Sequence, residues 1–254
     1  MRAIALQSGS SGNCIYVEAG DIRLLFDAGI SGKKAKTRLA EHGVDISLVN
    51  GVLISHNHWD HIACAGIYHR KWGLPLYMTQ GTFDATLKQR SLGNIQEVNH
   101  FPAGQSIDFG SVRVETVATP HDGVDGVCFV VEYGMKRVGV LTDLGHPFAE
   151  LTNLMGTLDG VFLESNYDEK MLATGPYPRF LKNRITGPEG HLSNTEAAHL
   201  IKNSGQKLSW VCLSHLSGEN NTPELALETS RDILGDNLDV SVASRQRAAQ
   251  MLHI

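Results

Sequence analysis

A segment that combines three histidines with one aspartate has the clearest chemistry in this sequence. It directly follows the apolar run 51–55, which predicts a buried strand, and it reads His56-Asn57-His58-Trp59-Asp60-His61. A strand that ends in such a cluster brings several ligand atoms to one rigid edge of a sheet. Imidazole nitrogen and carboxylate oxygen suit zinc, manganese and iron, and the lack of a thiolate in the segment argues against a closed structural zinc site. The segment therefore predicts a metal site.

Three downstream side chains repeat this setting, since each comes just past the carboxyl end of a predicted apolar strand. They are His121 after the strand at 112–118, Asp143 after 138–142 and His215 after 210–214. Four ligands on one short loop cannot all reach a single ion, so the first cluster needs partners of this kind. Each of the three alone is an ordinary loop residue, but their shared setting predicts that they join the first cluster.

The composition excludes several classes of protein. The chain has 254 residues, 42% hydrophobic and 19% charged, as expected for a globular protein that buries a full core. The net charge of −5 supplies no general attraction for nucleic acid, so a polyanion must be held by local cations and by metals. The four separated cysteines indicate free thiols in a reducing cytoplasm, and no apolar run fits a signal peptide or a membrane span.

The expected elements alternate between strands and helices along the whole chain. Strands recur in both halves, and helices are expected at 33–42, 62–72, 83–90, 195–203, 223–234 and 245–252. This order predicts two sheets packed face to face with helices outside, a four-layer αββα sandwich formed by a single domain at 1–254. The Gly/Ser-rich loop 8–13 is either a plain connection between strands or a part of the active site.

The ligand series His56-x-His58-x-Asp60-His61, His121, Asp143 and His215 resembles that of the dinuclear hydrolases of the metallo-β-lactamase superfamily. The resemblance implies two divalent ions, with zinc favoured and manganese compatible. One ion would be held by His56, His58 and His121, the second by Asp60, His61 and His215, and Asp143 would bridge the two. A bridging carboxylate offsets the repulsion between two neighbouring cations. Asp27, at the end of an early strand, would orient a ligand histidine by accepting its N–H.

The strings at 163–168, 190–194 and 216–223 narrow the resemblance to the YycJ/WalJ group of this superfamily, over essentially the whole chain. That group implies a phosphodiesterase or nuclease, including a DNA exonuclease role. Little chain separates His121 from Asp143 or Asp143 from His191, which leaves no room for the tRNA-gripping arm of many RNase Z enzymes or for the inserted domain of the RNase J type.

His191 lies outside the ligand series and precedes a helix whose start has a capping box, Ser193 to Glu196. It is a candidate for binding the scissile phosphate or protonating the leaving oxygen, beside helix N–H groups that suit a phosphate. The expected reaction is attack by a metal-bound hydroxide, with Asp60 or Asp143 accepting the proton of the nucleophile. A histidine that only packs before the helix is the alternative for His191.

Other residues concern the substrate, which is expected to be nucleic acid or a small phosphodiester. Arg179, Lys182 and Arg184 either grip a phosphate backbone or form a solvated loop. Trp59 could wall the pocket, and Tyr177 and Phe180 either stack on a base or pack in the core. A thioester or lactone hydrolase and a non-enzymatic metal-stabilised module are the competing functions. The sequence leaves the choice between DNA and RNA, and the oligomeric state, open.

Overall fold

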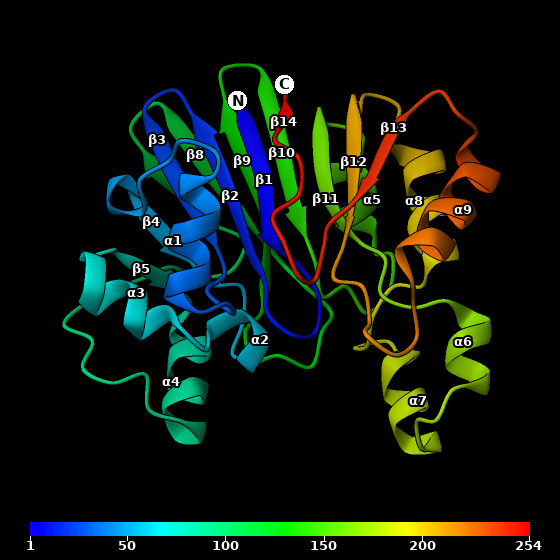
Figure 1. Cartoon of the computed structure of the whole chain (residues 1–254), viewed down its shortest axis with the longest axis horizontal. Coiled ribbons are helices and arrows are strands. Elements are labelled where there is room, and N and C mark those ends of the chain that lie inside the picture. Colours follow the sequence, from blue (N-terminus) through cyan, green and yellow to red (C-terminus); the bar gives the residue numbers. More distant parts are fainter.

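Two seven-stranded sheets pack face to face in the computed structural model, which describes residues 1–254, and helices cover both outer faces (Figure 1). The first sheet consists, in spatial order, of β14 (Leu252–His253), β1 (Arg2–Gln7), β2 (Cys14–Ala19), β3 (Ile22–Phe26), β4 (Gly51–Leu53), β5 (Leu76–Met78) and β6 (Val98–His100). The second consists of β13 (Asp239–Val242), β12 (Trp210–Ser214), β11 (Gly160–Glu164), β10 (Lys136–Leu141), β9 (Val127–Tyr133), β8 (Val112–Ala118) and β7 (Ser106–Phe109). The expected αββα sandwich is confirmed.

The helices fall into two groups along the chain. The first half contains α1 (Gly32–Ala40), the 3-10 turn η1 (Ile46–Leu48), α2 (Trp59–Ile62), α3 (Ala65–Trp72) and α4 (Gln80–Gln89). The second half contains α5 (Ala149–Met155), α6 (Glu169–Thr174), α7 (Arg179–Ile185), α8 (Asn194–Ser204) and α9 (Pro223–Leu234). Figure 1 shows the first group on the side of the first sheet and the second group on the opposite side. No helix is both long and apolar enough to cross a membrane.

Strand residues alternate between two cores because successive side chains point to opposite faces of a sheet. In β1, Ile4 packs toward the helices of the first half, whereas Ala5 belongs to the core between the sheets. Aromatic pairs fill that central core, with ring centroids 5.2 Å apart for Phe26 and Phe129. Burying such a ring contributes about 2 kcal/mol, so this core joins the two halves firmly.

Both sheets follow the same plan, in which antiparallel strands are succeeded by parallel ones. Strands β3 to β6 run parallel to one another, and so do β10 to β13. Parallel strands bring their carboxyl ends to one edge of a sheet, where the following loops meet. The loops after β3, β4, β10, β11 and β12 therefore share one rim of the sandwich, and that rim carries the site described below.

Three sequence expectations were wrong. The region 245–252 is no helix, because β14 pairs with the otherwise free edge of β1, and Ala249 donates its N–H to the Ala5 carbonyl at 2.9 Å. The helix expected at 62–72 is two helices, since Cys64 leaves helical geometry between them and donates its N–H to the Ala28 carbonyl. The solvated loop, one of two alternatives for Arg179, Lys182 and Arg184, is instead the helix α7, which has no buried residue; the grip on a phosphate backbone stays a prediction.

Candidate metal centre

Three strand-end residues share an unusual backbone conformation at the rim. Asp27 after β3, Asp143 after β10 and His215 after β12 have φ values of 64°, 60° and 56°. Residues other than glycine seldom adopt this left-handed backbone conformation, and those that do are concentrated at functional sites. The turn ends each strand abruptly and leaves the three side chains buried at the rim.

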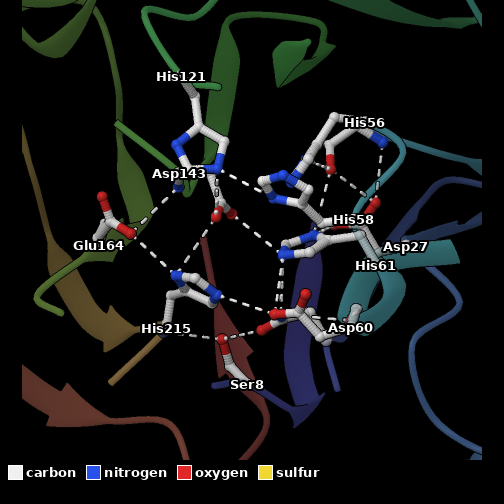
Figure 2. A network of polar contacts seen from close by, with 12 residues as sticks. Ser8, Asp27, His56, His58, Asp60, His61, His121, Asp143, Glu164 and His215 are labelled. Carbon is white, nitrogen blue, oxygen red and sulfur yellow. Dashed lines mark hydrogen bonds and ion pairs between the residues drawn. The ribbon is translucent and has the colours of Figure 1, made fainter. Parts of the chain in front are cut away.

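The structure brings all seven predicted ligands together (Figure 2). Within each of four overlapping groups the potential ligand atoms lie within 4.8 Å of one another; three groups contain only predicted ligands, namely His56/His58/His121, His56/His61/Asp143 and Asp60/His61/His215. Residues far apart in sequence meet closely, since Asp143 Oδ2 lies 3.2 Å from His61 Nε2 and His215 Nε2 lies 3.3 Å from Asp60 Oδ2. Asp143 and His215 therefore lie close enough to the segment 56–61 to share one metal centre with it.

In His58 and His121 of the first histidine group, one ring nitrogen contacts a protein acceptor and the other ring nitrogen faces the neighbouring imidazole. His121 Nδ1 donates to the Gly190 carbonyl at 2.9 Å, and His58 Nε2 lies 3.2 Å from the Asp122 carboxylate. The remaining nitrogens, His121 Nε2 and His58 Nδ1, face each other at 3.2 Å. Two facing lone pairs repel unless a proton or a cation lies between them. The geometry therefore suits a metal ion with neutral imidazole ligands.

His56 and His61 are oriented by a second set of contacts. Asp27 accepts a hydrogen bond from His61 Nδ1 at 2.7 Å and from the Ser55 hydroxyl at 2.9 Å. Because that hydroxyl gives its proton to Asp27, it accepts from His56 Nδ1, also at 2.9 Å. His56 Nε2 is then buried without any hydrogen-bond partner, and so is Asp143 Oδ2. Buried polar atoms rarely stay unpaired, and a bound cation would satisfy both.

Asp143 lies between the two groups of histidines. One of its oxygens is 3.4 Å from His121 Nε2 and the other is 3.2 Å from His61 Nε2. Burial alone would raise the pKa of this carboxyl, but the neighbouring imidazoles, His215 first among them, hold the pKa well below its ordinary value. The side chain is therefore an anion with one oxygen toward each group, which suits a bridge between two cations.

Protons and metal ions compete for the second group. Burial opposes charge on His215, but Asp143, Asp60 and Glu164 outweigh burial and raise its pKa to about 10. In the metal-free protein a proton thus occupies a position among three carboxylates. Binding of a divalent ion there requires neutral imidazole and releases that proton.

The loop 8–13 belongs to the site and is no plain connection between strands. Asn13 Nδ2 lies 3.2 Å from Asp60 Oδ2, and the side-chain oxygen Oδ1 of Asn13 accepts from the Ser8 hydroxyl at 3.0 Å. That hydroxyl in turn accepts the N–H of His215 at 2.9 Å. A single loop therefore ties Asp60 in the first half to His215 in the second.

Glu164, the last residue of β11, was missed as a functional candidate. It is completely buried, and its Oε1 accepts from His191 Nδ1 and His215 Nδ1, both at 2.9 Å. Its Oε2 accepts the N–H groups of Leu144 at 2.8 Å and Leu192 at 3.1 Å. Burial would raise the pKa of Glu164, but the charge of His191 and the two imidazole hydrogen bonds outweigh burial and lower the pKa to about 2. The ionised carboxylate holds both histidines in place.

The capping box before α8 is present, but the helix terminus differs from the expectation. Ser193 Oγ accepts the N–H of Glu196 at 3.1 Å, and the Glu196 carboxylate accepts the N–H of Ser193 at 2.9 Å. Asn194 donates its N–H to the Tyr167 carbonyl. These three donors are engaged within the protein, so this helix terminus does not offer the set of free N–H groups expected for a phosphate.

A cavity of about 320 Å³ opens over these residues. Its lining includes His58, Asp60, Asp143, His191 and His215, together with Trp59 from α2 and Tyr177, Leu181, Arg184 and Ile185 from the segment at α7. Arg184 pairs with Asp122 at 2.6 Å, whereas Phe180 is 75% exposed and is therefore no core residue. A larger cavity of about 810 Å³ beside β8 contains none of the predicted site residues, so cavity size alone does not locate the site.

Comparison with known proteins agrees with this geometry. A family model described as the metallo-beta-lactamase superfamily matches residues 8–169, more than half of the chain. The chain belongs to the metallo-beta-lactamase superfamily. It is 36% identical over 224 residues to a protein named exodeoxyribonuclease WalJ from Streptococcus pneumoniae, covering 87% of this chain and 83% of that protein. It is 32% identical over 232 residues to exodeoxyribonuclease YycJ from Bacillus anthracis, covering 90% and 87%. Within the superfamily it is thus a member of the WalJ/YycJ-like group.

Solved structures confirm the fold. The metallo-beta-lactamase fold protein YhfI from Bacillus subtilis superposes with a TM-score of 0.75 at 16% identity, covering 99% of this chain and 98% of YhfI. In this chain, the candidate ligand atoms are imidazole nitrogens and carboxylate oxygens, without a thiolate. Two of them, His56 Nε2 and Asp143 Oδ2, are buried without a hydrogen-bond partner. Superfamily membership and the ligand groups together indicate a metallo-hydrolase with divalent metal ions.

Proposed function

We propose that this protein is a nuclease that hydrolyses phosphodiester bonds in DNA with two divalent metal ions, zinc in the first place. His56, His58 and His121 would hold one ion and Asp60, His61 and His215 the other, with Asp143 shared. The relatives named exodeoxyribonucleases support this proposal, since they match most of the chain at 36% and 32% identity. Bound divalent ions would supply Lewis-acid activation of water and neutralise phosphate charge.

The observation that carries the proposal is His191. Its imidazole lies 3.9 Å from Asp143, lines the same cavity and is not one of the seven proposed ligands. Glu164 accepts its Nδ1–H at 2.9 Å, which fixes the ring. An imidazole held at the edge of the cavity can bind the scissile phosphate and donate a proton to the leaving oxygen.

Two carboxylates, Asp60 and Asp143, are candidates for accepting the proton of the attacking water and for bridging the two ions. Asp60 and Asp143 both have pKa values below the ordinary range: burial would raise them, but neighbouring imidazoles outweigh burial. Both are therefore ionised at neutral pH and able to accept a proton from an attacking water. Asp60 is the more accessible of the two, with its side chain 22% exposed against 4% for Asp143. We assign the proton-accepting role to Asp60 and the bridging role to Asp143.

The experiment is an assay of the metal-loaded protein on single-stranded DNA, double-stranded DNA and bis(p-nitrophenyl) phosphate. His58→Ala should abolish turnover, and His191→Gln should lower kcat by about 100-fold while metal content stays unchanged. His199→Gln is the matched control, because His199 is exposed on α8 away from the site. Turnover of S-lactoylglutathione or a homoserine lactone without any phosphodiester cleavage would contradict the proposal.

A further inference from the structure

Trp59 is unusually exposed for a tryptophan. It is the first residue of α2, between His58 and Asp60, yet its side chain is 47% exposed and lines the cavity over the metal centre. A tryptophan is large and apolar, and burial of most of its surface would stabilise the fold. A ring kept open at the mouth of a site is instead available to a ligand with an aromatic face.

Arg90 supports this ring from outside. Its guanidinium carbon lies 4.1 Å from the centroid of the Trp59 ring, within the range of a cation–π contact. Arg90 follows α4, is itself exposed, and forms no ion pair with an acidic side chain. The contact covers part of one ring face, steadies the ring and places an uncompensated positive charge at the rim of the cavity.

The second half of the chain also contributes to the lining of this cavity. Tyr177 and Leu181 line it from the segment that includes α7. Figure 1 shows α4 and α7 projecting from the same end of the two sheets, on opposite sides of the molecule. The lining of the cavity thus combines an indole with its cation from the first half of the chain and a half-buried tyrosine from the second half.

We propose that Trp59, backed by Arg90, is the stacking platform for the nucleobase next to the phosphodiester bond that is cleaved. This inference rests on the proposed nuclease function and names the part of the substrate that the site recognises. Every nucleobase has an aromatic face, so stacking on the indole tolerates any sequence. The neighbours of Trp59 in the chain, His58 and Asp60, are proposed ligands, so a base on this ring belongs to a nucleotide adjoining the reacting phosphate. Arg90 would attract the phosphate backbone of the same strand.

The test removes the indole from the protein and the base from the DNA, first separately and then together, and compares the losses in kcat/KM. Single-stranded oligonucleotides carry an abasic residue at each of the first few positions from the end that is degraded. For the wild-type protein we expect kcat/KM to fall by about tenfold at one of these positions. Trp59→Leu should lose about the same factor on normal DNA and show no further loss at that position, whereas Trp59→Phe should keep most of the wild-type difference.

Controls separate stacking from structural damage and from failure of the proposed function. Arg90→Gln should weaken DNA binding, whereas Lys71→Gln, which removes the cation from the other tryptophan–cation pair of the chain, should not. Loss of bound metal in Trp59→Leu, or an unchanged abasic difference in that variant, would overturn the stacking role. A wild-type protein that cleaves DNA equally well with and without each base would also overturn it. A wild-type protein that cleaves no DNA would instead refute the nuclease proposal itself.

Discussion

Replacing Glu164 by glutamine keeps the size of a completely buried side chain and removes its charge. In the native protein its two oxygens accept five hydrogen bonds, from the imidazoles of His191 and His215 and from the N–H groups of Asp143, Leu144 and Leu192. Glutamine supplies one carbonyl oxygen and one NH2 group, which donates. In either orientation of the amide, at least two of the five donors then face another donor.

The loss follows from this count. A buried donor left without an acceptor costs about 1–3 kcal/mol, so two of them cost about 4 kcal/mol in the free energy of unfolding. Removal of one partner from a buried charged pair gives a similar value, about 3–5 kcal/mol. A domain of this size is typically stable by about 5–15 kcal/mol. Glu164→Gln should therefore fold but unfold at a much lower urea concentration.

The same change should reduce catalysis. His191 loses the carboxylate that holds its ring in place, so kcat on single-stranded DNA should fall by about 100-fold with a smaller change in KM. Urea unfolding of the metal-free proteins measures the stability, and steady-state kinetics measures the rate. Glu228→Gln on the exposed side of α9 is the control and should change stability by less than about 0.5 kcal/mol. A Glu164→Gln protein with nearly wild-type stability and kcat would refute the proposed role of the carboxylate.

Three further predictions concern the centre and a distant ion pair. Gly29→Ala would place a Cβ 1.7 Å from the backbone oxygen of Asp60, so the ligand loop must shift and metal content should fall; full metal content would contradict this. Asp143→Asn should bind at most one divalent ion, which native mass spectrometry can check. Burial would raise the pKa of Asp159, but hydrogen bonds from Lys207, the Arg137 N–H and Lys136 outweigh burial and lower it. The stabilisation of the folded protein by this carboxylate is therefore complete above about pH 4, the pKa in the unfolded chain, and is lost as pH falls through the lower pKa of the folded protein. Asp159→Asn should flatten that acid limb of stability, and an unchanged slope would argue against it.

The sequence predicted which side chains meet at the rim, because their signal is local. Each of His121, Asp143 and His215 follows an apolar strand, and the structure places these strand ends at one rim. Glu164 has the same signal, as the last residue of an apolar strand, and could have been included on that ground. Its role was missed because its partners, the backbone N–H groups and the Nδ1 atoms, become visible only when the loops are folded.

Non-local contacts explain what the sequence could not reveal. The region 245–252 has a composition that fits a helix, but the free edge of β1 and its backbone groups determine its actual conformation. The contact between Trp59 and Arg90 joins α2 to the end of α4, and no spacing rule connects the two positions. The exposure of Phe180 likewise depends on how far α7 stands from the rest of the fold.

The left-handed turns at Asp27, Asp143 and His215 bear on how this protein can be engineered. A left-handed residue with a side chain is typically strained by about 1–3 kcal/mol, and glycine relieves that strain. At Asp27, however, glycine would also leave the buried donors of Ser55 and His61 without their acceptor, which costs about as much as the strain. The strained backbone is thus held by the contacts of its own side chains, and a library built to raise thermal tolerance should keep these three codons constant.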